Sequence, residues 1–165
     1  MTVPDITVEY LADRPEFIEQ LARVSWVEWQ TVYQQREETF AKALKNYRER
    51  ANIDRLPLAL VALRGGELIG MVSLKFHDMD TRPDLDPWLG GLFVVQEWRK
   101  RGVGSMLMHR AVDEGRRLKV PRLYLWTGSA EGLYRKLGWQ VVERTKYCGN
   151  NAVVMQMDLE SQVDS

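Results

Sequence analysis

A basic, glycine-rich turn lies near the middle of the chain. Residues 99–104 (RKRGVG) follow the apolar residues 88–95 and precede a helical pattern that begins near Ser105. Glycines in this turn permit backbone conformations and a close approach that a Cβ atom would forbid. The free N–H groups and the dipole of the first helical turn attract anions, and three cationic side chains surround the same place. The spacing therefore predicts a binding site for a diphosphate group.

Three known phosphate-binding patterns can be compared with this turn. The P-loop is excluded because no Gly-Lys-Ser/Thr follows the glycines. The dinucleotide fingerprint fits poorly, since Leu107 stands at its third small position and residues 122–127 offer no acid for a ribose. The pattern R/Q-x-x-G-x-G/A is satisfied by residues 99–104. Without a second motif, an ordinary strand-to-helix turn with solvated charges would remain the simpler interpretation.

Composition limits the class of protein. The chain has 165 residues, of which 45% are hydrophobic, and we expect one domain over residues 1–165 with a flexible tail at 160–165. Because 23 Lys and Arg balance 23 Asp and Glu, we expect neither a nucleic-acid nor a membrane partner. Cys148 is the only cysteine and His77 and His109 lie far apart, so we expect no internal disulfide and no metal site. No apolar run reaches the roughly 18 residues of a membrane span, which favours a cytoplasmic protein.

The first half of the chain predicts strands and helices in alternation. Residues 6–10 alternate like a strand, and Asp13, Pro15 and Glu16 resemble the N-cap, early proline and capping-box glutamate of a helix. Later patterns predict a helix carrying Phe40, Leu44 and Tyr47, a hairpin of residues 58–63 and 68–74 across Gly65 and Gly66, and a polar connector at 77–87.

The second half predicts a strand, a helix and a parallel strand. Gly90 and Gly91 inside the strand at 88–95 indicate a bulge or a close backbone approach. The helix after the basic turn ends near Lys119, and the strand at 122–127 follows it, which together form a βαβ unit. A short helix at 130–137 and an antiparallel pair at 139–144 and 152–157, joined across Gly149 and Asn150, complete the pattern.

A second motif, residues 130–139 (AEGLYRKLGW), follows the last strand of this unit. With the basic turn, it resembles the GNAT superfamily of acyl-CoA-dependent N-acetyltransferases, whose A-x-x-L-Y-x-K-x-G-F segment it matches with Trp139 for Phe. The resemblance covers residues 6–159. It implies an α/β fold with a mixed, mainly antiparallel central sheet flanked by helices, a βαβ unit that holds the cofactor, and acetyl-CoA as cosubstrate without a metal.

The resemblance also implies roles for particular residues. The diphosphate would lie on the N–H groups of residues 101–105, and the pantetheine arm would pair with residues 92–94 in a gap beside the strand at 122–127. An N–H near Phe93 or Val94 would stabilise negative charge on the thioester oxygen, and Tyr134 would protonate the leaving thiolate. The cofactor-binding candidates are Leu92, Phe93, Val94, Arg99, Lys100, Arg101, Gly102, Val103, Gly104, Ser105 and Thr127.

Thr127 departs from the family pattern. Relatives often place an asparagine at this position, where its amide helps to hold the cofactor. A threonine hydroxyl donates only one hydrogen bond, which makes this contact weaker or differently routed. An alternative interpretation is that Thr127 caps the next helix.

A general base is not evident in the strand at 88–95, because this strand contains no Glu or His. The candidates lie in the connector and are His77, Asp78, Asp80, Asp84 and Asp86. We select Asp80, since it comes just past the end of the hairpin strand and can face the thioester through a water. Each of these aspartates is alternatively a turn or cap residue. Together they predict an acidic acceptor side, which would favour a cationic substrate.

The functional hypothesis is transfer of an acetyl group from acetyl-CoA to a primary amine by direct attack on the thioester. The acceptor would be a small cationic amine or a protein amine, and the protein a monomer or homodimer. The alternative is a non-catalytic acyl-CoA-binding sensor or regulatory module that keeps the basic turn but lacks a productive base. Release of CoA in the presence of amines distinguishes the two.

Overall fold

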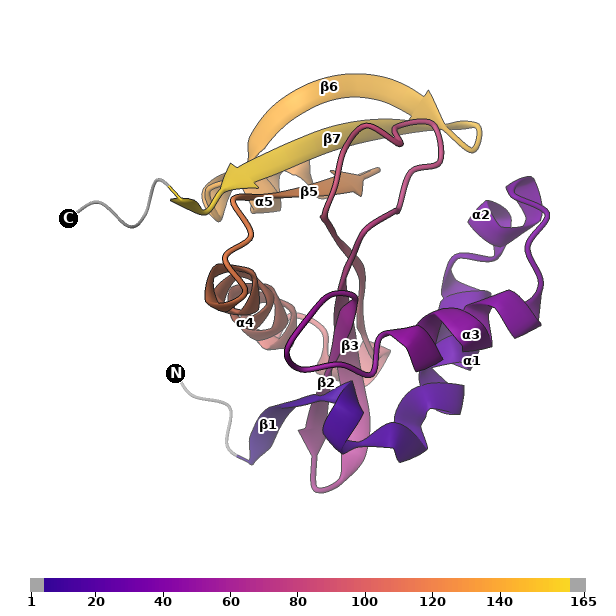
Figure 1. Ribbon diagram of the computed structural model, residues 1–165, viewed down its shortest axis with the longest axis vertical. Coiled ribbons are helices and arrows are strands. Elements are labelled where there is room, and N and C mark those ends of the chain that lie inside the picture. The colour runs from indigo at the N-terminus through magenta and orange to yellow at the C-terminus, as the bar shows by residue number, and fades with distance from the viewer. Residues whose placement is uncertain (1–4, 161–165) are drawn as a thin grey trace.

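The computed structural model describes residues 5–160, which form one seven-stranded sheet with helices on both faces (Figure 1). The strands are β1 (Ile6–Tyr10), β2 (Leu58–Arg64), β3 (Glu67–Lys75), β4 (Trp88–Val94), β5 (Arg122–Thr127), β6 (Gln140–Tyr147) and β7 (Asn150–Asp158). The helices are α1 (Ile18–Glu28), α2 (Gln30–Gln35), α3 (Phe40–Glu49), α4 (Val103–Arg117) and α5 (Glu131–Lys136), with 3-10 turns η1 (Leu11–Asp13), η2 (Pro15–Phe17) and η3 (Gln96–Trp98). None of the described helices is long and apolar enough to cross a membrane.

The strand order is β1-β2-β3-β4-β5-β7-β6, in which β4 and β5 run parallel and the other neighbouring pairs are antiparallel. The predicted α/β class with a mixed, mainly antiparallel sheet is thus confirmed. The predicted parallel pairing across the βαβ unit is confirmed as well. Of the tail predicted to be flexible, residues 161–165 lie outside the described part of the chain.

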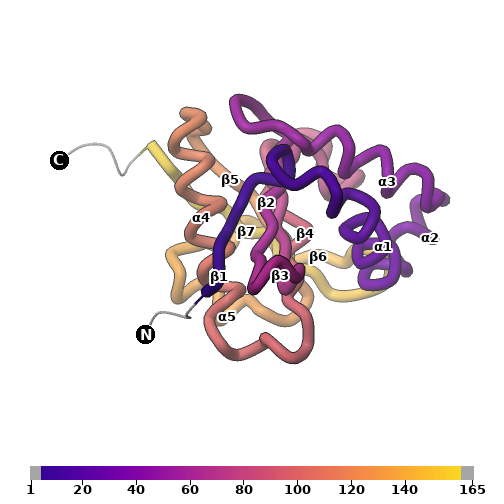
Figure 2. The backbone as a smooth tube through the Cα atoms, turned by 90° about the horizontal axis from the view of Figure 1, so that it is seen from below, coloured from indigo at the N-terminus to yellow at the C-terminus, as the bar shows by residue number. Residues whose placement is uncertain are grey.

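The helices bury an apolar surface on each face of the sheet. In both views α4 lies on one side of β2 and β3, while α1, α2 and α3 lie on the other (Figures 1 and 2). Leu107 and Ala111 of α4 are fully buried against strand residues such as Leu74. On the opposite face, Leu21 of α1 and Tyr47 of α3 join a separate cluster. Burial of these two stripes orients the helices around the sheet.

Two tight turns show how local backbone demands set the hairpins. Gly65 and Gly66 both have positive φ, at 59° and 84°, which confirms the predicted turn between β2 and β3. The turn between β6 and β7 differs by one residue from the prediction. It is centred on Cys148 (φ 50°) and Gly149 (φ 81°) rather than on Gly149 and Asn150. This register lets both strands extend further than the sequence pattern indicated.

The predicted cap of the first helix is wrong. The chain forms η1 and η2 before α1 begins at Ile18, and no side chain caps these elements. Glu16 pairs with Arg14 at 2.9 Å instead of completing a capping box. Pro15 occupies the first position of η2, where its missing N–H costs no hydrogen bond.

A bulge in β4 changes the path of this strand. Met71 of β3 pairs with Phe93, whereas Ser73 pairs with Gly90, so β4 contains one extra residue between these pairs. Gly91 adopts a φ of 62° within this bulge, which only glycine tolerates without strain. The predicted bulge is therefore confirmed.

Beside the bulge, β4 and β5 separate from each other. Their ladder contains the single pair Trp88 and Tyr124, at the start of β4. Beyond this pair the two strands no longer share hydrogen bonds, which confirms the predicted gap between them.

A buried carboxylate joins α4 to β1. The side chain of Glu114 is 7% exposed and accepts hydrogen bonds from Tyr10 (2.9 Å), Arg110 (3.0 Å) and Arg117 (2.9 Å). Burial raises the pKa of this carboxyl group, but the three donors outweigh burial and hold the pKa below its ordinary value of 4.5.

We expect Glu114→Gln to lower the free energy of unfolding by about 1–2 kcal/mol at pH 7, because two arginines lose their carboxylate. A lowered folded-state pKa stabilises the fold above the unfolded value, and this stabilisation is lost as the pH falls through the folded value. The difference between wild type and variant should therefore shrink below pH 4.5. Urea unfolding of wild type and variant at pH 7 and at pH 3 measures this difference in the free energy of unfolding. The same difference at both pH values would contradict the role given to Glu114.

Candidate active site

The basic turn adopts the geometry of an anion site. Lys100 (φ 62°) and Gly102 (φ 86°) turn the backbone sharply, and Gly102 is the N-cap of α4. The first hydrogen bond of this helix joins the N–H of Met106 to the carbonyl of Gly102 at 3.0 Å. Among residues 5–160, no backbone carbonyl accepts from the N–H groups of residues 103–105.

Space beside these N–H groups is open. A Cβ atom at Gly104 would meet only the Val94 side chain, at 3.8 Å, and one at Gly102 would meet nothing within 4 Å. Packing inside the protein therefore does not require a glycine at position 104. The absence of a side chain instead keeps the approach to the first turn of α4 clear.

The cationic side chains of the turn lie against neighbouring aromatic rings. Arg99 donates to the carbonyl of Val94 at 2.8 Å and lies over the ring of Phe93, with 5.5 Å from its guanidinium carbon to the ring centroid. Arg101 lies over Trp98 at 4.9 Å. These contacts hold two charges near the turn while the side chains remain exposed.

Beyond the bulge, one edge of β4 is unpaired. Val95 donates its N–H to the carbonyl of Ile69 in β3 at 2.9 Å. Because alternate residues of a strand direct their N–H groups to the same side, Phe93 also faces β3, whereas Leu92 and Val94 face the gap toward β5. Two of the three predicted backbone positions thus present polar groups to the gap.

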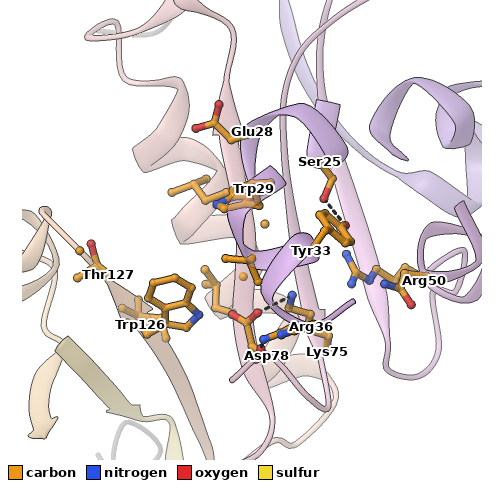
Figure 3. A pocket seen from close by; sticks show the side chains of 18 of the residues that line it. Ser25, Glu28, Trp29, Tyr33, Arg36, Arg50, Lys75, Asp78, Trp126 and Thr127 are labelled. Atoms are coloured by element: carbon orange, nitrogen blue, oxygen red, sulfur yellow. Dashed lines mark hydrogen bonds and ion pairs between the residues drawn. The ribbon is translucent and has the colours of Figure 1, made fainter. Parts of the chain in front are cut away.

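A pocket of about 370 Å³ opens where β4 and β5 separate. Its walls come from residues 89–92 of β4, from β5 and the loop that follows it, and from α1, α2 and α3. Figure 3 shows Trp126 and Thr127 of β5 on one side and Ser25 of α1, Tyr33 of α2 and Arg50, which follows α3, on the other. Tyr134 of α5 lines the same space. The pocket therefore connects the open edge of β4 with the helical face of the sheet.

Residues 18–139 match the family described as Acetyltransferase (GNAT) family. The chain belongs to the GNAT acetyltransferase family. Enzymes of this family use acetyl-CoA, the cosubstrate expected from the sequence. A search of curated proteins gives no match.

Solved structures show the same GNAT fold. The chain is similar to yncA from Salmonella typhimurium, solved with acetyl-CoA (TM-score 0.70, 17% identity, 97% of each chain covered). It is also similar to Ard1 from Thermoplasma volcanium (TM-score 0.69, 19% identity, 94% of this chain and 98% of that one). An aminoglycoside 6'-N-acetyltransferase with coenzyme A has a TM-score of 0.67 and 17% identity, with 93% of this chain and 96% of that one covered.

The GNAT motif at residues 130–139 brings Tyr134 to the pocket. The ring packs partly against the apolar cluster under α4, and burial raises the pKa of the hydroxyl above 10.0. Thr127 lies nearby, but its oxygen accepts from the N–H groups of Ser129 (3.3 Å) and Ala130 (3.0 Å). These bonds hold the loop before α5, whose N-cap is Ala130 and receives no side-chain cap, so the alternative that Thr127 caps this helix is wrong.

The connector acids do not gather into an acidic surface around the pocket. Asp80 is exposed, lies outside the pocket lining and accepts a hydrogen bond from Tyr147 at 2.9 Å. Asp84 pairs with Arg82 at 3.0 Å. Asp86 lines a different depression, beside Tyr124 and Arg122. Asp78 is the connector acid that lines the pocket.

Asp78 does not stand alone in the pocket. It pairs with Lys75 of β3 at 2.8 Å, and its backbone carbonyl accepts a hydrogen bond from Arg36. Burial lowers the pKa of Lys75 from its ordinary 10.5, and Asp78 opposes this effect. The prediction that four aspartates make the acceptor side acidic is therefore wrong, since only Asp78 lines the pocket and its charge is paired with that of Lys75.

Several pocket residues were not identified from the sequence. They are Tyr47, Arg36, Arg50 and Lys75, together with Ser25, which forms a hydrogen bond with Tyr33 (2.8 Å). Tyr47 and Tyr33 follow the apolar spacing of a helix, which made them indistinguishable from core residues. The three cations carry no sequence signal, because they come from three separate elements.

Proposed function

We propose that this protein is an N-acetyltransferase that moves the acetyl group of acetyl-CoA to a primary amine by direct attack on the thioester. The observation that carries this proposal is the separation of β4 from β5, since Tyr134 lines the pocket at this gap and Gly104, at the free N–H groups of α4, lies beside Val94 of the open strand edge. A small amine suits a pocket of about 370 Å³ better than a folded protein surface does.

The residues present fit acetyl-CoA. The diphosphate would be held by the N–H groups of residues 101–105 and by the charges of Arg99, Lys100 and Arg101, in the space that a Cβ at Gly104 would fill. The pantetheine amides would pair with Leu92 and with the N–H of Val94 at the open edge of β4, since the Val94 carbonyl already accepts from Arg99. Phe93 would not pair with the pantetheine arm through its backbone, because its N–H faces β3. When bound, the cosubstrate supplies a thioester whose carbonyl carbon accepts the amine.

Two groups of this chain would stabilise the charges that develop during transfer. A backbone N–H directed into the gap, at Val94 or Leu92, would stabilise negative charge on the thioester oxygen. Tyr134 would donate its proton to the sulfur of CoA as the bond to the acetyl carbon breaks. Its raised pKa keeps this hydroxyl protonated at neutral pH.

The mechanism also needs a group that accepts the proton of the amine. Asp80, proposed from the sequence, reaches the pocket only through Tyr147 and Arg36, since Arg36 donates to the Tyr147 hydroxyl at 2.8 Å and lines the pocket. Asp78 lies closer to the bulge, because its carboxylate oxygen is 2.8 Å from the position of a Cβ at Gly90. We therefore propose Asp78 as the proton acceptor and Asp80 as a positioning residue.

We expect Asp80→Asn to lower kcat/KM by less than about 10-fold and to keep the acidic limb of its pH profile. The double variant Lys75→Met/Asp78→Asn should remove that limb, and it leaves no unpaired buried charge that would prevent folding. The pH profile of kcat/KM is measured with two acceptors whose amines differ in pKa. A limb that belongs to an enzyme group stays at the same pH with both acceptors, whereas a limb that belongs to the amine moves. Loss of the limb in Asp80→Asn alone would return the role of base to Asp80.

Turnover tests the proposed function against the sensor alternative. Purified protein is mixed with acetyl-CoA and a panel of polyamines, aminoglycosides, amino acids and peptides, and free CoA thiol and acetylated product are measured together. An N-acetyltransferase releases CoA in equal amount to the N-acetylated product. A sensor would bind CoA in calorimetry and release no more thiol with amines than without them.

A further inference from the structure

Arg50 carries a buried positive charge that lacks a carboxylate partner. The residue follows α3, is 8% exposed and lines the pocket. Its side chain donates to the hydroxyl of Ser73 at 3.2 Å, and among residues 5–160 no acid lies within ion-pair distance of it. Its guanidinium also lies over the ring of Tyr47, 4.5 Å from the ring centroid. Four of its five N–H donors are thus left without a protein acceptor, and the two nitrogens that have no partner at all keep some accessible surface, so a bound ligand can reach them.

Tyr47 provides a second, independent observation. This residue is 1% exposed, and its hydroxyl is the one buried side-chain polar atom of the described residues that has no hydrogen-bond partner. Buried hydroxyl groups in proteins almost always have a partner. The hydroxyl oxygen lies 3.4 Å from the position of a Cβ at Gly91, so it faces the bulge beside the gap. An oxygen acceptor bound in the pocket would satisfy it.

The other charges of the pocket do not compensate Arg50. Lys75 and Asp78 pair with each other, and Arg36 binds the Tyr147 hydroxyl and the Asp78 carbonyl. Glu28 and Glu38 also belong to the lining, but Glu28 is exposed and Glu38 partly so. In Figure 3, Arg50 lies beside Tyr33, on the opposite side of the pocket from Trp126. Of the charged residues in this lining, Arg50 is the one that is buried, and it has no buried acid beside it.

We propose that the acceptor is an amine that also bears a carboxylate, and that Arg50 and the Tyr47 hydroxyl bind this carboxylate. A planar guanidinium matches two carboxylate oxygens, and a phenol adds one further donor. Because the Tyr47 hydroxyl faces the bulge, the amine must lie within a few bonds of the carboxylate, as it does in an amino acid. This inference rests on the proposed N-acetyltransferase function and assigns its substrate class, in place of the cationic amine expected from the connector acids.

The first test compares amino acids with their amides as acceptors. Each common L-amino acid is paired with its primary amide, and spermidine serves as a purely cationic acceptor. The amide has the less basic amine and hence more of the reactive neutral form at pH 7.5, so reactivity alone favours the amide. We expect kcat/KM to be at least about 10-fold higher for the acid than for the amide of the preferred amino acid. Equal or faster turnover of the amides and of spermidine would overturn the assignment.

The second test removes the two binding groups. Arg50→Gln should raise KM for the amino acid by about 10- to 100-fold and leave KM for its amide unchanged. If this variant does not fold, Arg50→Lys keeps the charge, loses the planar fork and should raise KM for the acid by a smaller factor. Equal losses for acid and amide in whichever variant folds would show that Arg50 only supports the fold.

Tyr47→Phe has a matched control in the same pocket. It removes a hydroxyl without a partner, so the unfolding midpoint should stay the same or rise, while KM for the acid rises about 3- to 10-fold. Tyr33→Phe removes a hydroxyl bonded to Ser25 and should lower the midpoint. A fall in kcat for acid and amide alike would place the Tyr47 hydroxyl on the thioester instead, against the proposal.

Calorimetry separates this inference from the proposed function. The amino acid is titrated into wild type and Arg50→Gln with CoA present, where no transfer occurs. Binding that depends on Arg50 supports the carboxylate site even if no amine is acetylated, which would contradict the N-acetyltransferase function alone. Acetylation of amines together with Arg50-independent binding would contradict the carboxylate site and leave the function standing.

Discussion

Tyr134→Phe is expected to lower kcat by about 10²- to 10⁴-fold with little change in the affinity for CoA. The substitution keeps the ring and its packing against the cluster under α4 but removes the proton that the thiolate would take. In wild type, burial raises the pKa of Tyr134 above 10.0, so the acid should stay protonated and active up to at least that pH. Steady-state kinetics from pH 7 to 10 and calorimetry with CoA measure both effects.

Tyr124→Phe is the matched control for this prediction. Tyr124 lies on β5 near the pocket, but its side chain belongs to a different cluster and does not line the pocket. Its variant should keep kcat within about 3-fold of wild type, as is usual for a residue outside a reacting site. If Tyr134→Phe also keeps its kcat, then water or the incoming amine protonates the sulfur and Tyr134 has only a packing role.

Substitutions at Gly104 should separate stability from cofactor binding. A Cβ at this position meets the protein only at 3.8 Å, so Gly104→Ala should fold and raise the free energy of unfolding by roughly 0.5–1 kcal/mol, because alanine is the better helix former. The same methyl group would enter the space expected for the diphosphate. We therefore expect weaker binding of CoA in a more stable protein, measured by calorimetry and urea unfolding.

Gly104→Val should extend this effect. Its larger side chain should lower the affinity for CoA by at least about 100-fold, since it prevents the phosphates from reaching the N–H groups of α4. Arg99→Ala should lower the affinity for CoA by a smaller factor, because it removes one exposed charge contact and leaves those N–H groups accessible. Unchanged CoA affinity in a folded Gly104→Val protein would remove the assignment of this turn to the diphosphate.

Most of the fold follows from local sequence patterns. Two consecutive glycines predicted the β2–β3 turn because each needs a positive φ, and two glycines predicted the bulge of β4 because Gly91 needs one as well. The start of α1 was placed wrongly because two 3-10 turns, η1 and η2, precede the helix. The β6–β7 turn was placed one residue too late because Cys148, a residue other than glycine, adopts a positive φ beside Gly149.

The cofactor half of the proposed site was similarly predicted from two contiguous motifs, 99–104 and 130–139, within which spacing along the chain fixes spacing in the structure. The acceptor half was not. The connector between β3 and β4 has no regular period, so the sequence could not show that Asp78 faces the pocket while Asp80 turns toward Tyr147.

By itself, therefore, the sequence determined the fold class and the family, and it predicted a diphosphate site at the basic turn, because each depends on residues close together in the chain. Only the tertiary structure decided which charges surround the acceptor. Tyr47 lies in α3, Arg50 follows the end of this helix, and Lys75 lies in β3, so the three residues meet only when α3 packs on the sheet. The burial that leaves Arg50 without a carboxylate and Tyr47 without a hydrogen bond is a property of that packing.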